Sequence, residues 1–159
     1  MKRRELFGSL VSSFNKESKQ EILLRPPYYK DETNFITKCQ TCNNECASAC
    51  EVNIIIIQED NTPKLDFSNS GCTYCDLCAK ACPNDVLALQ YKKNIDTKIS
   101  INPLECLSWN QVMCFSCKDP CLDEAIEFIA MFRPKINDDC TSCGFCIKVC
   151  PTNAIKIGA

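Results

Sequence analysis

The chain has 159 residues, of which 16 are cysteine and none is histidine, and its formal net charge is −2 at neutral pH. That charge argues against a nucleic-acid-binding protein, which would show a basic excess. The lack of histidine excludes mixed cysteine–histidine zinc sites, histidine-bound haem and a histidine general base. Large apolar residues other than cysteine are few for this length, so we expect something bound to cysteine to complete the core.

The first fourteen residues, MKRRELFGSLVSSF, carry the pair Arg3-Arg4 ahead of apolar residues at helical spacing, which start at Leu6 and Phe7. An export signal would continue with a long apolar core and a small-residue cleavage site, whereas NKESKQE follows here. We therefore predict an amphipathic helix that stays in the mature protein, and a cytoplasmic location. This helix folds back on its own body, docks a partner through Arg3, Arg4, Leu6 and Phe7, or lies on a membrane surface.

The next segment, RPPYY at 25–29, contains two prolines, which favour an extended backbone. It either holds the N-terminal helix against the body or docks a partner through Arg25, Tyr28 and Tyr29. We predict a unit at residues 1–34, made of the helix and this extended segment, followed by a cysteine-rich region at 35–159. No apolar run reaches the roughly 18 residues that a membrane span requires, so no transmembrane segment is expected.

The cysteines fall into four groups of four, and the first members of successive groups lie 33, 34 and 34 residues apart. Groups two and four read C-x2-C-x2-C-x3-C-P, the bacterial ferredoxin pattern, in which three cysteines bind one [4Fe–4S] cluster and the fourth binds the cluster of a partner group. The cores of the four groups are 39–50, 72–83, 106–121 and 140–151. The predicted ligands are Cys39, Cys42, Cys46, Cys50, Cys72, Cys75, Cys78, Cys82, Cys106, Cys114, Cys117, Cys121, Cys140, Cys143, Cys146 and Cys150.

Groups one and three depart from this pattern. Group one has three residues between Cys42 and Cys46 and ends in Glu51 instead of proline, and group three has seven residues between Cys106 and Cys114. A longer loop can still deliver its thiolate, because the entropic cost of loop closure grows slowly with length. Whether group one holds a full cluster stays open.

Two other uses of cysteine compete with cluster binding. Disulfides are disfavoured because short C-x2-C spacing at a fixed period is poor for bridging distant strands. Zinc ribbons would show two C-x2-C pairs separated by about 15 to 20 residues, which is not the spacing here. Iron–sulfur ligation is therefore the interpretation that we adopt.

An apolar patch follows each group in the same register, at 54–57, 86–89, 125–129 and 154–157. We read these patches as strands, and we expect hairpins in VNIIIIQEDNTPKLDF, with its turn at Asp60-Asn61, and in VLALQYKKNIDTKISI, around Asn94. The stretch AIEFIAMFRPKIND has less room to turn. The predicted fold class is an α+β polyferredoxin of two ferredoxin-like 2[4Fe-4S] lobes. Groups either pair in chain order or nest, one with four and two with three.

These motifs resemble the NapF-type ferredoxins that accompany periplasmic nitrate reductase. The resemblance rests on Arg3-Arg4, on RPPYYKDETNFITKCQTC at 25–42, on CLSWNQVMCFSCKDPC with Leu107, Val112 and Asp119, and on FRP at 132–134. It implies a cytoplasmic accessory protein with four [4Fe-4S] clusters that binds the precursor of the catalytic subunit of periplasmic nitrate reductase before export and assists its maturation. The extra residue in group one departs from the family.

Nothing in the sequence supplies a substrate pocket or a nucleophile–base pair, so we do not expect an enzyme. The apolar residues after each group predict low reduction potentials, because the added electron must sit in an apolar surround. Besides the maturation partner, we keep a second hypothesis, an electron-transfer relay ferredoxin or an iron–sulfur subunit of a membrane oxidoreductase. A third, an exported ferredoxin, would require cleavage after Phe14.

Overall fold

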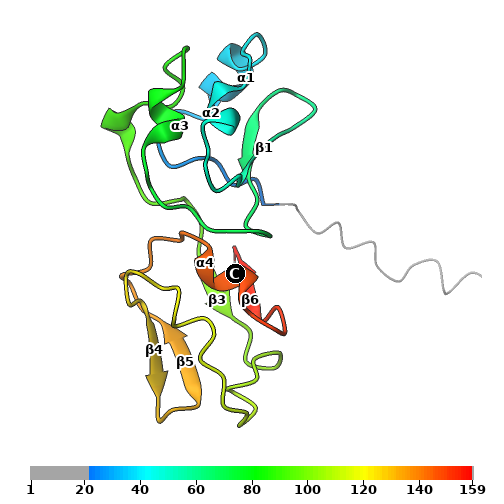
Figure 1. Ribbon diagram of the computed structural model, residues 1–159, viewed down its shortest axis with the longest axis vertical. Helices are drawn as coiled ribbons and strands as arrows, with labels where there is room; N and C mark the ends of the chain where they lie inside the picture. The colour runs from blue at the N-terminus through cyan, green and yellow to red at the C-terminus, as the bar shows by residue number, and fades with distance from the viewer. Residues whose placement is uncertain (1–21, 159) are drawn as a thin grey trace, which may run out of the picture.

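The computed structural model describes residues 22–158 and shows two lobes stacked along the long axis of the molecule (Figure 1). The predicted N-terminal helix, with Arg3, Arg4, Leu6 and Phe7, lies outside the described residues. Within them, no helix is long and apolar enough to cross a membrane.

The first lobe contains α1 (Thr33–Lys38), α2 (Glu45–Ser48), β1 (Ile55–Ile57), β2 (Pro63–Leu65), α3 (Leu77–Lys80) and the 3-10 turn η1 (Leu89–Tyr91). The second contains β3 (Ile99–Ile101), β4 (Ile126–Ile129), β5 (Arg133–Ile136), α4 (Phe145–Lys148) and β6 (Ile155–Ile157).

The first predicted hairpin is confirmed. Strands β1 and β2 pair antiparallel, with Ile55 opposite Leu65 and Ile57 opposite Pro63. The turn contains Asn61 at a φ of 61°, a left-handed conformation that asparagine tolerates. Asp60 supports the turn by accepting a 3.0 Å hydrogen bond from the backbone N–H of Thr62.

The second predicted hairpin, around Asn94, is wrong. Strand β3 pairs instead with β6, in the register Ile99 to Ile157, and the patch at 86–89 does not form a strand with it. The reason is a competing partner from far upstream, because Leu87 forms an antiparallel bridge with Tyr29. A hairpin forms instead in the stretch AIEFIAMFRPKIND, which we expected to have less room for a turn. It joins β4 and β5, and its tight turn contains Ala130 and Met131 at φ values of 49° and 69°.

The extended segment before α1 packs inside the first lobe, and the packing shows no boundary at residue 35. The carbonyl of Leu24 accepts a 2.8 Å bond from the N–H of Leu65, next to the β1–β2 hairpin. Arg25 donates to the hydroxyl of Thr62 at 2.9 Å and to the carbonyl of Pro63 at 2.6 Å, and its guanidinium lies 4.7 Å from the centre of the Phe35 ring.

Two tyrosines anchor the same segment. Tyr28 is 1 % exposed and its hydroxyl donates a 2.7 Å hydrogen bond to Asp76, while the Tyr29 ring packs edge-on against Phe35. Arg25 and Tyr29 are each 7 % exposed. The partner-docking role considered for Arg25, Tyr28 and Tyr29 is therefore corrected, because their side chains are used inside the lobe.

The two lobes repeat one plan. In each, the chain before the first cysteine group pairs with the chain after the second: the Tyr29–Leu87 bridge in the first lobe corresponds to β3–β6 in the second. In each, a hairpin stands between the two groups, β1–β2 in the first lobe and β4–β5 in the second. The buried cores of both lobes include cysteine thiols, which agrees with a core completed through cysteine.

Candidate metal centres

The sixteen cysteines line four cavities, with four cysteines in each. Three come from one group and the last comes from the fourth position of another group in the same lobe. The cavities have nearly equal volumes, of about 330, 340, 320 and 350 Å³ for sites 1 to 4. Site 1 is lined by Cys39, Cys42, Cys46 and Cys82, site 2 by Cys72, Cys75, Cys78 and Cys50, site 3 by Cys140, Cys143, Cys146 and Cys121, and site 4 by Cys106, Cys114, Cys117 and Cys150. Groups one and two therefore share sites, as do groups three and four, which resolves the pairing in favour of chain order.

The backbone conformation that follows the fourth cysteine is the same in all four groups. Three residues beyond that cysteine the chain takes a left-handed turn, with φ between 50° and 52°, at Asn53, Asp85, Glu124 and Asn153. The next residue points its side chain into the cavity that the fourth cysteine lines, and each of these side chains is at most 2 % exposed. They are Ile54, Val86, Ala125 and Ala154. The shared register of the apolar patches, seen in the sequence, thus gives each site an apolar wall.

Short helices carry the third cysteine of groups one, two and four. Each helix starts after a left-handed residue, namely Asn44, Asp76 and Gly144, at φ values of 63°, 68° and 86°. The left-handed residue turns the chain sharply, so that the second and third cysteines reach the same cavity. Gly144 lines site 3, as expected for a residue without a Cβ beside a cluster.

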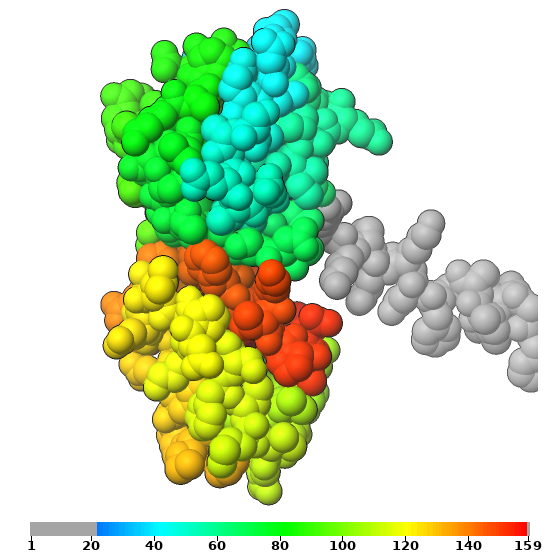
Figure 2. All heavy atoms as spheres, viewed as in Figure 1, coloured from blue at the N-terminus to red at the C-terminus, as the bar shows by residue number. Residues whose placement is uncertain are grey.

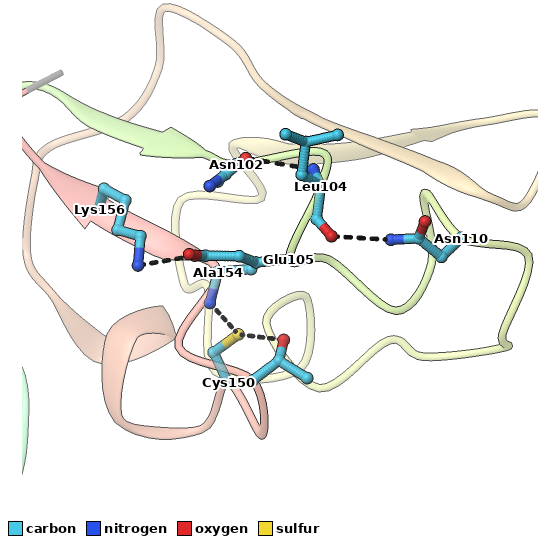
Figure 3. Close-up of polar contacts among 8 residues, drawn as sticks. Asn102, Leu104, Glu105, Asn110, Cys150, Ala154 and Lys156 are labelled. Atoms are coloured by element: carbon cyan, nitrogen blue, oxygen red, sulfur yellow. Dashed lines mark hydrogen bonds and ion pairs between the residues drawn. The ribbon is translucent and has the colours of Figure 1, made fainter.

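An asparagine side chain holds each irregular group in place. In group one the amide of Asn61, on the β1–β2 turn, donates to the carbonyl oxygens of Cys39 at 2.7 Å and Cys42 at 3.2 Å. In group three the amide of Asn110 donates to the carbonyl of Leu104 at 3.3 Å (Figure 3). It also donates to the carbonyl of Cys106 at 2.8 Å. These two asparagines were missed from the sequence. The sequence feature that could have indicated them is their position: Asn61 lies in the predicted hairpin turn, and Asn110 lies in the long gap between Cys106 and Cys114.

Site 4 is further fixed by contacts that Figure 3 shows around Cys150. Its sulfur accepts a 3.2 Å hydrogen bond from the backbone N–H of Ala154. On the neighbouring strand Lys156 forms a 2.7 Å ion pair with Glu105, which directly precedes Cys106. These contacts tie β6 to the start of group three, so that the cysteines of groups three and four meet.

Burial raises the pKa of several of these thiols. It raises the pKa of Cys46, Cys78 and Cys146 to about 12, and neighbouring thiolates add to the effect. The pKa of Cys42 is also raised, first by burial and then by its 3.1 Å hydrogen bond to Glu45, which precedes Cys46. The pKa of Cys150 is shifted the other way: burial alone would raise it, but backbone N–H groups that bond its sulfur bring it below its usual value.

The arrangement of the thiols fits a cluster better than the alternatives. All sixteen cysteines are free thiols, so none is used in a disulfide. Within residues 22–158 no three Cys, Asp or Glu side chains converge on a point that could hold a single metal ion. A zinc site needs four sulfurs at about 2.3 Å from one ion. Here four sulfurs instead surround a cavity, as binding one iron corner each of a cubic [4Fe–4S] cluster requires.

Comparison with known proteins agrees with this chemistry. Residues 38–86 match the family model described as a 4Fe-4S dicluster domain, and residues 134–156 match that of a 4Fe-4S binding domain. The chain is 34% identical to the ferredoxin-type protein NapF of Escherichia coli K12 over 83% of this chain and 82% of that protein. It is 32% identical to NapF of Haemophilus influenzae over 97% and 89%, and 29% identical to the ferredoxin-type protein NapG of Escherichia coli K12 over 86% and 70%.

Proposed function

Since this chain belongs to the family of NapF ferredoxin-type iron–sulfur proteins, which bind [4Fe–4S] clusters, we propose that it holds four such clusters, one in each of sites 1 to 4. The observation that carries the count is the fourfold repetition of one cavity: equal volume, four thiols and an apolar wall. Site 1 does not differ from the others in this respect, despite the extra residue in its loop. When bound, each cluster supplies one-electron redox chemistry, and the protein supplies the thiolates, the apolar walls and the N–H groups that set its potential.

The biological role that we propose is that of an accessory protein in the cytoplasm, which binds the catalytic subunit of periplasmic nitrate reductase before export and assists its maturation. Family membership supports this role. So do three exposed apolar side chains in the segment 104–113, where Leu104 is 88% exposed, Met113 65% and Val112 51%. Exposed apolar side chains close together favour a protein-binding surface, and this segment leads into and spans the long gap of group three.

Co-purification with the unexported precursor tests the proposal. We expect the loaded protein to retain the precursor, and the triple variant Leu104→Ser, Val112→Ser, Met113→Ser to lose it at unchanged iron content. The matched control is Ile36→Ser, which removes a 59% exposed apolar side chain from α1 in the other lobe and is expected to leave retention unchanged. Failure of the wild-type protein to bind the precursor would contradict the role.

A second candidate function is electron relay within a larger oxidoreductase. It is favoured by a 29% identity to an NADH-quinone oxidoreductase subunit I of Symbiobacterium thermophilum, over 56% of this chain and 42% of that protein. In the same assay, no retention of the precursor together with rapid cluster reduction by a quinol would favour the relay.

A further inference from the structure

The two lobes meet where the loop of group two touches the loop of group four. We call this contact the seam: residues 71–74 of the first lobe and 141–145 of the second. At its centre the backbone N–H of Cys72 donates a 2.7 Å hydrogen bond to the carbonyl oxygen of Cys143. Figure 2 shows the segment that carries group four pressed against the lower edge of the first lobe. One cysteine lines site 2 and the other lines site 3, so these two sites are neighbours across the lobe boundary.

Side chains on both sides lock the seam. The hydroxyl of Tyr74 donates to the carbonyl oxygen of Thr141 at 2.5 Å and accepts a 3.1 Å bond from the N–H of Ile95, in the linker between the lobes. The hydroxyl of Ser142 donates to the carbonyl of Thr97 in the same linker at 2.7 Å. Ser142 is only 5% exposed, so the polar groups of the seam bond to one another and not to water.

Two glycines make the close approach possible. A Cβ at Gly71 would lie 2.5 Å from the backbone nitrogen of Phe145 and 2.7 Å from the carbonyl oxygen of Cys143. A Cβ at Gly144 would lie 2.5 Å from the ring of Phe67, which belongs to the first lobe. Backbone atoms cannot move aside as a flexible side chain can. Any larger residue at Gly71 must therefore push the lobes apart.

We propose that the seam is an electron-transfer bridge, so that sites 1 to 4 form one continuous path through both lobes. This inference rests on the proposed occupancy of all four sites. The step is the transfer of one electron: the cluster in site 2 is oxidised, the cluster in site 3 is reduced, and no bond breaks and no proton moves. The reverse transfer uses the same bridge, and an external one-electron donor loads the path.

The route across the seam is short. From the sulfur of Cys72 to the sulfur of Cys143 it crosses only the atoms of these two residues and the hydrogen bond between them. The route runs through protein atoms held by the hydrogen bonds of the seam, and Ser142 beside it is only 5% exposed, so little solvent must reorganise when the charge moves.

Within each lobe the remaining steps are already short. In the first lobe Cys46 of site 1 and Cys78 of site 2 lie on the packed helices α2 and α3. In the second lobe Cys117 of site 4 packs against the hydrophobic cluster that contains Cys146 of site 3. The seam is therefore the step on which passage from one lobe to the other depends.

Low-temperature EPR of the fully reduced, iron-loaded full chain tests the bridge. Unpaired spins on neighbouring reduced clusters broaden and split each other's signals, and the effect falls steeply with distance. Cluster pairs within one lobe interact equally in the wild-type protein and in the seam variants. The difference between their spectra therefore isolates the interaction between clusters in different lobes. We expect Gly71→Ala to lose the part of the interaction that crosses the lobes, at unchanged iron content. Asn69→Ala, an exposed position in the same loop, is expected to keep the wild-type spectrum.

Identical spectra for Gly71→Ala and wild type would overturn the bridge. Should Gly71→Ala fail to keep its iron, Tyr74→Phe decides in the same way, because it removes two hydrogen bonds of the seam without adding an atom. A weakened cross-lobe interaction in Tyr74→Phe supports the bridge, and an unchanged one contradicts it. The occupancy of the sites is judged separately, from the iron content of the wild-type protein, so failure of the proposed function and failure of the bridge are distinguishable.

Discussion

The side-chain amide of Asn61 donates a 2.7 Å hydrogen bond to the carbonyl oxygen of Cys39, so the β1–β2 turn holds the first cysteine loop. The same amide bonds the carbonyl of Cys42. Removing it in Asn61→Ala leaves these carbonyls without their partner, which we expect to cost roughly 1–3 kcal/mol. Site 1 should then release its iron to a chelator faster than the other three sites, measured by absorbance under anaerobic conditions. Asn69→Ala is the control, and equal release from both variants would contradict the role of Asn61.

Double cysteine variants test which groups share a site. Cys42 and Cys82 line the same cavity, so Cys42→Ala with Cys82→Ala should disrupt one cluster and leave about 12 iron atoms, by three intact clusters of four. Cys42→Ala with Cys78→Ala should disrupt two clusters, because Cys78 lines site 2. Iron analysis of the two proteins, purified side by side, distinguishes these outcomes. If the groups were nested, Cys42 and Cys82 would belong to different sites, and both double variants would lose the iron of two clusters.

Arg25 is expected to act in stability and not in partner binding. Its guanidinium is buried and bonds Thr62 and Pro63, and hydrogen bonds to charged groups contribute about 1.5–3 kcal/mol each. Arg25→Ala should therefore lower the free energy of unfolding of the loaded protein by about 2 kcal/mol or more in anaerobic denaturant titration. Arg25→Lys should rescue little, because an ammonium group cannot reproduce the planar fork of the guanidinium. An Arg25→Ala variant that keeps wild-type stability but no longer binds the precursor would contradict this assignment.

Cluster assembly should depend on pH in a defined direction. Burial raises the pKa of the Cys46, Cys78 and Cys146 thiols to about 12, so in the iron-free protein they carry protons throughout the neutral range. The ligand is the thiolate, and binding must therefore release these protons, so occupancy should rise as pH rises from about 6.5 to 8.5. Anaerobic reconstitution with limiting iron, together with the base needed to hold the pH constant, measures both effects. Occupancy that does not change with pH, with no proton release, would contradict the protonated state of these thiols.

The sequence predicted the sites better than it predicted the strand pairing. Cysteine spacing is a local property, and so is the register of the apolar patches that begin at Ile54 and Ala154, so both could be predicted from the sequence. The hairpin expected around Asn94 failed because Leu87 pairs with Tyr29, and competition from a distant segment leaves no local signal. The sharing of sites between groups also depends on how the two hairpins fold each lobe.

The departures from the ferredoxin pattern were harder to judge from sequence alone. The extra residue before Cys46 left open whether group one holds a full cluster. In the structure, Asn61 and the left-handed Asn44 bring Cys39, Cys42 and Cys46 around a cavity like the others. Asn61 lies in a hairpin turn beyond group one, and only the folded hairpin brings it to the loop. The seam between Cys72 and Cys143 is likewise a property of two packed lobes.

Iron and acid-labile sulfide analysis of the anaerobically purified full chain tests the central claim most directly. Four thiol-lined cavities of equal size predict about 16 iron and about 16 sulfide per chain, by four clusters of four. Colourless protein that contains zinc, or brown protein with about 8 iron atoms per chain, would contradict the account of four equivalent sites.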